Sequence, residues 1–142
     1  MMVSTKGRYA LRVMIDLAEH NTGEPLLLMD IAKRQGISEK YLEGIMAVLS
    51  KHGFVNAQRG RGGGYKLARS PEDYTVWSIL TLIEGPLVPV SCLENEVNNC
   101  ERAAECRTLP MWSQLSTLIR KYLEGVTLAD LLVTDAADQY VI

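Results

Sequence analysis

Two helical segments separated by a glycine, in residues 28–45, constrain the fold of this 142-residue chain more than any other feature. Here the small side chain of Ala32 lets the second helix approach closely, Gly36 supplies a tight turn, and Ser38 caps the next helix. The second helix has an apolar, core-facing stripe formed by Leu42, Ile45 and Leu49. The pattern predicts a helix-turn-helix, although any helical hairpin with a glycine turn resembles it.

A short hairpin follows and makes this prediction more specific. Residues 54–59 and 65–68 have the composition of two strands, and four glycines occupy the loop 60–64 between them. A helix-turn-helix followed by a hairpin is a winged helix. A glycine-rich loop can also bind nucleotide phosphates, but such a site needs a strand-to-helix junction, and this loop joins two strands.

Further helices flank this unit. One begins at Ser4 or Thr5, one is capped by Thr75, and one begins at Thr108 and Pro110. The last, residues 109–124, has an apolar stripe of Leu115, Leu118, Ile119, Tyr122 and Leu123. This stripe is wider than one subunit needs, which favours a homodimer over packing on its own winged helix alone.

The sequence therefore predicts a mainly α (α+β) fold: a winged helix-turn-helix with a small two-stranded wing and a long C-terminal dimerisation helix. We expect a DNA-binding domain in residues 1–86 and a cysteine loop in residues 87–107. Residues 108–142 then hold the dimerisation helix, a short final helix and a tail that frays from Val133.

Charge is divided unevenly along the chain. The net charge is only −2, but residues 1–69 hold 11 Lys and Arg against 6 Asp and Glu, whereas residues 70–142 hold 4 against 11. This distribution indicates a basic module that contacts DNA beside an acidic module for signal sensing or subunit assembly. Two differently solvated faces of one domain are the alternative.

The candidate DNA contacts come from three places. Arg59 and Arg61 in the wing can enter a narrow minor groove, and the basic residues Lys6, Arg8 and Arg12 of the first helix are free to reach phosphate. The predicted DNA-binding residues are Arg8, Ser38, Lys40, Tyr41, Glu43, Arg59, Gly60, Arg61 and Gly62.

Glu43 is the most informative residue of the second helix. Facing the major groove, its carboxylate can accept a hydrogen bond from cytosine N4, and it is repelled by sites that lack a donor. It would then select among operators. The alternative is an ion pair on the helix surface with Lys40, three residues earlier.

All three cysteines, Cys92, Cys100 and Cys106, fall within one 15-residue stretch with the spacing C-x7-C-x5-C. The stretch is acidic, rich in Asn and without helical or strand periodicity, so it reads as an exposed loop rather than a place where thiols fill core gaps. No segment is apolar enough to span a bilayer, and the charged start does not suit a signal peptide, so we expect a cytoplasmic protein. Three clustered thiols in a reducing compartment indicate a metal, an iron–sulfur cluster or a redox switch.

Taken together, the chain closely resembles the Rrf2 family of bacterial transcription regulators, and within it the IscR-like and NsrR-like members that carry iron–sulfur clusters. The resemblance covers residue 1 to about residue 132. It rests on the motifs at residues 6–10, 35–38, 41–43 and 59–65, and on the cysteines followed by Trp112. It implies a homodimeric regulator in which the three thiolates bind a cluster close to the recognition helix of the dimer, so that cluster loading alters DNA affinity or site choice.

Two departures from the family pattern concern the cluster. The first cysteine gap is longer than in typical members, and the positions where relatives carry a fourth ligand, a His or an acidic residue, hold Leu109 and Arg8 here. The fourth ligand is therefore unassigned, and either a two-iron (2Fe-2S) or a four-iron (4Fe-4S) cluster is compatible. The protein candidates are Glu94, Glu96, Glu101, Glu105, His20 and His52, and an external thiol is another.

Other functions use the same residues differently. A zinc-dependent or thiol-redox winged-helix repressor would need the cysteines but no iron. An enzyme is not expected, because His20 and His52 are the only histidines and form no catalytic constellation with a carboxylate. The expected partners are double-stranded operator DNA, a second copy of the chain and cluster-assembly or cluster-donor proteins, with no membrane. The signal is iron, oxygen, nitric oxide or cluster supply.

Overall fold

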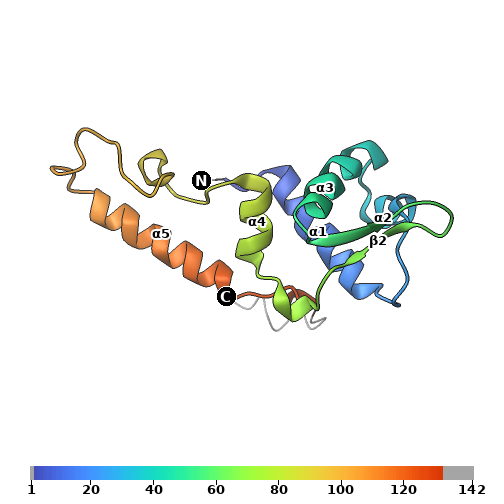
Figure 1. Ribbon diagram of the computed structural model, residues 1–142. Helices are drawn as coiled ribbons and strands as arrows, with labels where there is room; N and C mark the ends of the chain where they lie inside the picture. Colours follow the sequence, from blue (N-terminus) through green and yellow to red (C-terminus); the bar gives the residue numbers. More distant parts are fainter. Residues whose placement is uncertain (1, 133–142) are drawn as a thin grey trace.

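The computed structural model describes residues 2–132, so the tail predicted to fray from Val133 lies outside the described part. Figure 1 shows a group of helices with a hairpin at one end and a long helix with an extended loop at the other. The elements are α1 (Thr5–Glu19), α2 (Leu28–Gln35), α3 (Glu39–Lys51), β1 (Val55–Gln58), β2 (Gly64–Leu67), η1 (Pro71–Asp73), α4 (Val76–Glu84), η2 (Ser91–Leu93), α5 (Leu109–Glu124) and η3 (Asp130–Leu132). The predicted mainly α fold with a two-stranded wing is confirmed.

The helix-turn-helix forms as the sequence predicts. Gly36 ends α2 in the left-handed region, with φ of 65°, and the Ile37 N–H donates to the Ala32 carbonyl at 3.1 Å. Ser38 then caps α3, because its Oγ accepts a hydrogen bond from the Tyr41 N–H at 3.2 Å. The predicted core-facing residues of α3 are all fully buried: Leu42, Ile45 and Leu49.

The wing is a short antiparallel pair in which Val55 lies opposite Leu67. Both strands differ slightly from the predicted ranges 54–59 and 65–68. The Phe54 N–H is used to close the end of α3, donating to the Leu49 carbonyl at 2.8 Å. Tyr65 pairs on its other side with Leu26, exchanging two backbone hydrogen bonds of 2.8 Å. These bonds tie the base of the wing to the body of the domain.

The main core lies where α1, α2, α3, α4 and the wing meet. Its fully buried members include Ala10, Val13, Met14, Ile31, Leu42, Ile45, Met46, Leu49, Tyr74 and Ile79. A smaller second cluster, formed by Val76, Leu80 and Leu87 with Leu123 packed against it, joins α4 to α5. Apolar burial of this kind contributes roughly 1.5–3 kcal/mol for each large side chain, so the winged helix contains most of the stabilising contacts.

The predicted apolar stripe of α5 divides in the structure. Ile119 and Leu123 are half-buried, and Leu123 packs against α4, while Leu118 and Tyr122 are 59% and 71% exposed. The outward group consists of Met111, Leu115, Leu118 and Tyr122, and we call it the outer face of α5. The split reflects contact with α4 on one side only. Within residues 2–132 no helix is long and apolar enough to span a membrane.

The short final helix expected within residues 108–142 is the 3-10 turn η3. Its start is capped from both directions, because the Asp130 N–H donates to the Thr127 hydroxyl and the Thr127 N–H donates to the Asp130 carboxylate. Leu128, between them, is fully buried in the main core. The chain therefore returns from α5 to the winged helix before the described part ends.

Candidate nucleic-acid interface and cysteine loop

The outward side of α3 carries the residues predicted to read DNA. Lys40, Tyr41 and Glu43 are exposed, and Ala47 one turn later is small and exposed as well. The alternative role for Glu43 does not form here: among residues 2–132 the ion pairs involve Asp16 with Arg34 and His20, and Arg120 with Glu124, but not Lys40 with Glu43. The carboxylate of Glu43 is left facing solvent, so it can meet base edges.

A groove of about 580 Å³ separates α3 from the wing. Glu43 and Ala47 line it from α3, and Arg59 and Gly60 line it from the wing. Lys51 adds a second basic side chain at the C-terminal end of α3. The groove thus combines one carboxylate with flanking cations, a composition that suits a phosphate backbone on either side of readable base edges.

The wing loop is exposed at its tip and tightly packed at its base. Arg59 and Arg61 are exposed, and Gly60 and Gly62 have φ of 89° and 76°, which favour glycine. Gly63 is buried, and its N–H donates to the Gly60 carbonyl at 2.9 Å. A side chain on Gly63 would collide with the backbone carbonyls of Gln58 and Gly60. The two arginines are therefore presented on a loop with a defined shape.

The structure corrects one expectation about α1. Arg8 is exposed, and its guanidinium donates to the Thr5 hydroxyl at 3.2 Å. Arg12, by contrast, is not free to reach phosphate, because its Nε donates to the Gln35 side chain at 3.1 Å and its Nη2 donates to the Gln35 carbonyl. The Arg12 side chain is therefore bound to α2, a tertiary contact that periodicity along α1 does not reveal.

The cysteine loop is anchored to α1 at its start. Glu84, the last residue of α4, accepts hydrogen bonds on Oε1 from the Ser4 N–H at 3.0 Å and from the Ser4 hydroxyl. Gly7 makes room for this carboxylate, since a Cβ there would overlap it. A carboxylate at the N-terminus of α1 also interacts favourably with the helix dipole. The end of α4, which leads into the loop, is thus fixed to the start of α1.

The three thiols are free and accessible to different degrees. Cys92 in η2 and Cys106 are half-buried, and Cys100 is exposed. The Cys100 N–H donates to the Asn98 Oδ1 at 2.8 Å, while the buried Asn98 Nδ2 has no partner within the described residues. Thiolates are the ligands that iron–sulfur clusters use, so the donor set suits one. In residues 2–132, however, the side chains are not gathered into a group able to hold a metal, so binding would require the loop to rearrange.

The thiol of Cys106 lies among hydrogen-bond donors at the start of α5. Its Sγ lies 3.4 Å from the Thr108 Oγ1, just before the start of α5. The hydrogen bond with the Thr108 hydroxyl, and further bonds from the backbone N–H groups of Thr108 and Leu109, lower the pKa of this thiol. A thiol with a lowered pKa is more often a thiolate, the form that binds metal or reacts with oxidants.

Within one chain the cysteine loop lies far from α3. Figure 1 shows the loop between α4 and α5 at one end of the molecule and the wing at the opposite end. The loop therefore does not press on the helix of Glu43 in the same chain. The unassigned ligand candidates His20 and His52 sit at the ends of α1 and α3, away from the loop, with each Nδ1 3.0 Å from a backbone carbonyl of its own helix.

Two polar residues that organise these surfaces were missed from the sequence. Asp16 is fully buried on α1, where it binds Arg34 and Gln35 of α2, and Glu84 anchors the start of the loop. For Asp16 a signal existed, because it lies three residues after Val13 and next to Leu17 on the core side of α1. A charged residue at such a position needs buried partners.

Comparison with known sequences places the chain in a family of transcriptional regulators. The profile of the family described as "Rrf2: Iron-dependent Transcriptional regulator" matches residues 3–134. The chain belongs to the Rrf2 family. The regulator IscR of Aliivibrio salmonicida is 36% identical over 139 residues, 98% of this chain and 82% of the relative. The protein rrf2 of Nitratidesulfovibrio vulgaris is 39% identical over 132 residues, 93% of this chain and 87% of the relative.

Solved structures of family members share the fold. IscR of T. potens is 39% identical, covers 100% of this chain and 93% of its own, and has a TM-score of 0.74. CymR of B. subtilis, described as its global cysteine regulator, is 34% identical, covers 93% and 96%, and has a TM-score of 0.75. The chain is thus a winged-helix transcriptional regulator of the Rrf2 family, resembling IscR, and not an enzyme.

Proposed function

We propose that this regulator binds operator DNA under the control of an iron–sulfur cluster held by Cys92, Cys100 and Cys106. The observation that carries the proposal is three free thiols on one loop, between two helices, in a chain 36% identical to a regulator named IscR. The fourth ligand stays open, as does the choice between a two-iron and a four-iron cluster. When bound, such a cluster supplies a centre whose integrity depends on iron, oxygen or nitric oxide.

The proposed DNA interface combines α3, the wing and the start of α1. Lys40, Tyr41 and Glu43 face the major groove, with Glu43 selecting sites that offer a cytosine N4 donor. Arg59 and Arg61 enter the minor groove, where Gly60 and Gly62 allow the backbone to approach closely. Arg8 contacts phosphate, and Ser38, whose hydroxyl already caps α3, presents its side chain at the helix start.

Control of DNA binding requires a route from the cysteine loop to α3. In one chain the loop lies at one end of the molecule, and α3 lies beyond α4 toward the wing (Figure 1), so we propose that the loop acts on α3 of a second chain. The outer face of α5 supplies the contact, because four exposed apolar side chains on one helix form a self-complementary surface for a two-fold dimer. A two-fold dimer would also space two α3 helices for adjacent turns of DNA. On this proposal residues 1–86 bind DNA, residues 87–107 hold the cluster and residues 108–142 form the dimer contact.

The contribution of the chain to cluster binding is local. The hydrogen bond from Thr108 and the N-terminal amides of α5 stabilise the thiolate of Cys106, the form in which a cysteine binds iron. Because few backbone hydrogen bonds hold residues 94–107, the loop can move Cys92 and Cys100 toward Cys106. We expect loop order to differ between cluster-loaded and cluster-free protein.

The test is anaerobic purification, with a visible absorption spectrum and iron and sulfide analysis, of the wild type and a Cys92→Ala, Cys100→Ala, Cys106→Ala variant. The proposal predicts a brown wild type whose colour and iron are absent from the variant. A colourless wild type that cannot be reconstituted with iron and sulfide would contradict it.

The lowered pKa of Cys106 specifically favours a second function, a thiol-redox repressor without a cluster. The likeness to CymR structures, one of them of an oxidised form from Staphylococcus aureus, points the same way. This function predicts colourless protein whose DNA binding is changed by oxidant, restored by dithiol and insensitive to oxidant after Cys106→Ser. A zinc-dependent repressor would instead contain zinc and lose DNA binding on chelation.

A further inference from the structure

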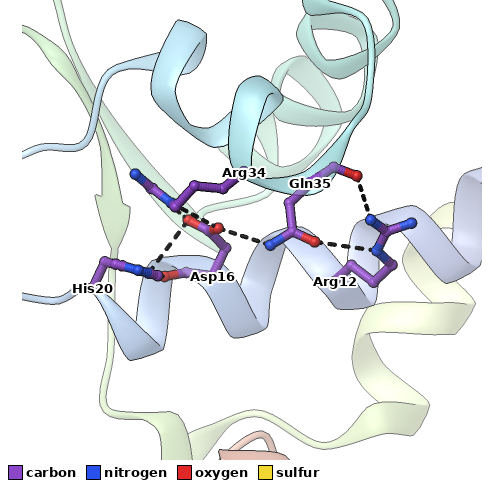
Figure 2. Close-up of polar contacts among 5 residues, drawn as sticks. All are labelled: Arg12, Asp16, His20, Arg34 and Gln35. Atoms are coloured by element: carbon purple, nitrogen blue, oxygen red, sulfur yellow. Dashed lines mark hydrogen bonds and ion pairs between the residues drawn. The ribbon is translucent and has the colours of Figure 1, made fainter.

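A buried carboxylate on α1 holds the end of α2, immediately before the turn of the helix-turn-helix. Asp16 is 0% exposed. Its Oδ1 accepts from the Arg34 Nη2 at 2.7 Å, and its Oδ2 accepts from the Arg34 Nε at 3.0 Å and from the Gln35 Nε2 at 2.8 Å. Figure 2 shows Arg34 and Gln35 converging on this one side chain. Both are the last residues of α2, and Gly36 follows.

Arg12, one turn earlier on α1, also holds the last residue of α2. Its guanidinium binds the side chain and the backbone carbonyl of Gln35 (Figure 2). The guanidinium also lies 5.2 Å from the ring centre of Tyr9, and the Tyr9 ring packs edge-on against Tyr41 with centroids 5.7 Å apart. Since Tyr41 belongs to the first turn of α3, α1 contacts the chain on both sides of the turn.

Hydrogen bonds and apolar contacts restrict the turn in different ways. The apolar core between α1, α2 and α3 is attractive in any direction, so it permits small sliding movements. The bonds to Asp16 are directional and use both carboxylate oxygens, so they fix where α2 ends relative to α1. A buried ion pair is a weak source of net stability compared with apolar residues of the same size. Its effect is therefore expected mainly in geometry.

We propose that Asp16, through Arg34 and Gln35, is a positioning residue for DNA recognition: it fixes the turn that orients α3. It is buried under α2 and does not itself touch DNA. The inference rests on the proposed reading of DNA by α3. It adds a determinant outside the candidate interface, on the face of α1 that carries Tyr9, Arg12 and Asp16.

The test compares Asp16→Asn with Leu80→Ala, a control that removes core volume from the second cluster, away from the turn. The probe is a duplex selected by the wild type from a random pool, with an unrelated duplex of equal length as the non-specific reference. Asp16→Asn should weaken binding to the selected duplex about tenfold, the scale of one lost base contact, while leaving non-specific binding nearly unchanged. Leu80→Ala should preserve the ratio of the two affinities.

Hydrogen exchange supplies a readout that does not depend on DNA. In Asp16→Asn the amides of Ile37 and Tyr41, bonded across and just after the turn, should exchange about tenfold faster relative to β1 amides, because their local opening is easier. Arg34→Lys, which keeps the charge but loses the planar fork, should give an intermediate result. If Asp16→Asn does not fold, the same measurements on Arg34→Lys provide the test.

The outcomes separate the inference from the proposed interface. Unchanged exchange at Ile37 and Tyr41, or an affinity ratio no lower than that of Leu80→Ala, would overturn the role of Asp16. Lys40→Ala and Arg59→Ala serve as contact variants on the same duplex. If they bind like the wild type, the proposed interface fails, while the exchange result still decides whether Asp16 fixes the turn.

Discussion

The winged helix and the C-terminal segment of this chain differ in how completely they bury their apolar side chains. In α1 and α3 the apolar stripes close on one another, and residues such as Met14, Leu42 and Leu49 are fully removed from solvent. In α5 not one residue is fully buried, and Leu118 and Tyr122 are mostly exposed. The winged helix is complete within one chain, whereas α5 and the loop before it retain surface and thiols for something else to occupy.

This difference suggests a division of labour. The winged helix has directional bonds on both sides of its turn. Its wing is tied to Leu26 by backbone bonds and to Tyr74, whose hydroxyl donates to the Phe54 carbonyl, so the winged helix presents Glu43 and the arginines in fixed positions. The cysteine loop has few such bonds. Segments with few buried contacts are the ones that open and rearrange most easily, which suits a segment that must respond to a signal.

The largest expected effect comes from removing core volume in the winged helix. Leu42→Ala should lower the free energy of unfolding by about 2–5 kcal/mol, because Leu42 is 0% exposed and its cavity cannot collapse fully. The matched truncation Leu118→Ala, measured by urea denaturation at a concentration where the protein is monomeric, should cost less than about 0.5 kcal/mol. Equal losses from the two substitutions would remove the contrast between the regions.

The next effect tests what covers the outer face of α5. Leu118→Glu should weaken the homodimer by about 2 kcal/mol or more, because two-fold symmetry places the new charge in the apolar contact twice. Sedimentation velocity across a dilution series measures this. Thr117→Glu adds the same charge at an exposed polar position of α5 and should leave the dimer intact. A wild type that is monomeric at every concentration would show that α5 is not a dimer contact.

A smaller effect is expected in how the free energy of unfolding falls at acid pH. Burial raises the pKa of Asp16, but hydrogen bonds from Arg34 and Gln35, with the charges of Arg34 and His20, outweigh it, so the pKa in the folded protein is below the ordinary value. The contribution of Asp16 to stability is therefore full above the unfolded pKa of about 3.9 and is lost as the pH falls through the lower, folded pKa. Urea denaturation from pH 6 downward should show a shallower acid loss in Asp16→Asn than in the wild type. Identical pH profiles would exclude this role.

The predictable part of this fold is the part set by local chemistry. Ser4, Ser38 and Thr75 cap helices as their residue types predict, and Gly36 makes the turn because it alone of its neighbours accepts a positive φ readily. Periodicity correctly places the core side of α3. The wing follows from its glycines and strand composition, with each strand end shifted by one residue.

The rest depends on which segments meet. Periodicity counts apolar residues, so it does not place Asp16 on the buried side of α1, and it does not reveal that Gln35 of α2 binds Arg12. The apolar stripe of α5 predicts one continuous surface, but contact with α4 covers only part of it. Cysteine spacing indicated a ligand set, yet spacing along a loop does not determine whether the three thiols lie together in space.

The most direct test of cluster-controlled DNA binding is the affinity of cluster-loaded and cluster-free protein for the same selected duplex, measured anaerobically beside the triple cysteine-to-alanine variant. The account predicts that loading changes the affinity of the wild type by about fivefold or more, the lower range of allosteric coupling, and leaves the variant unchanged. Equal affinity of the loaded and cluster-free wild type, for every duplex that either form selects, would contradict it.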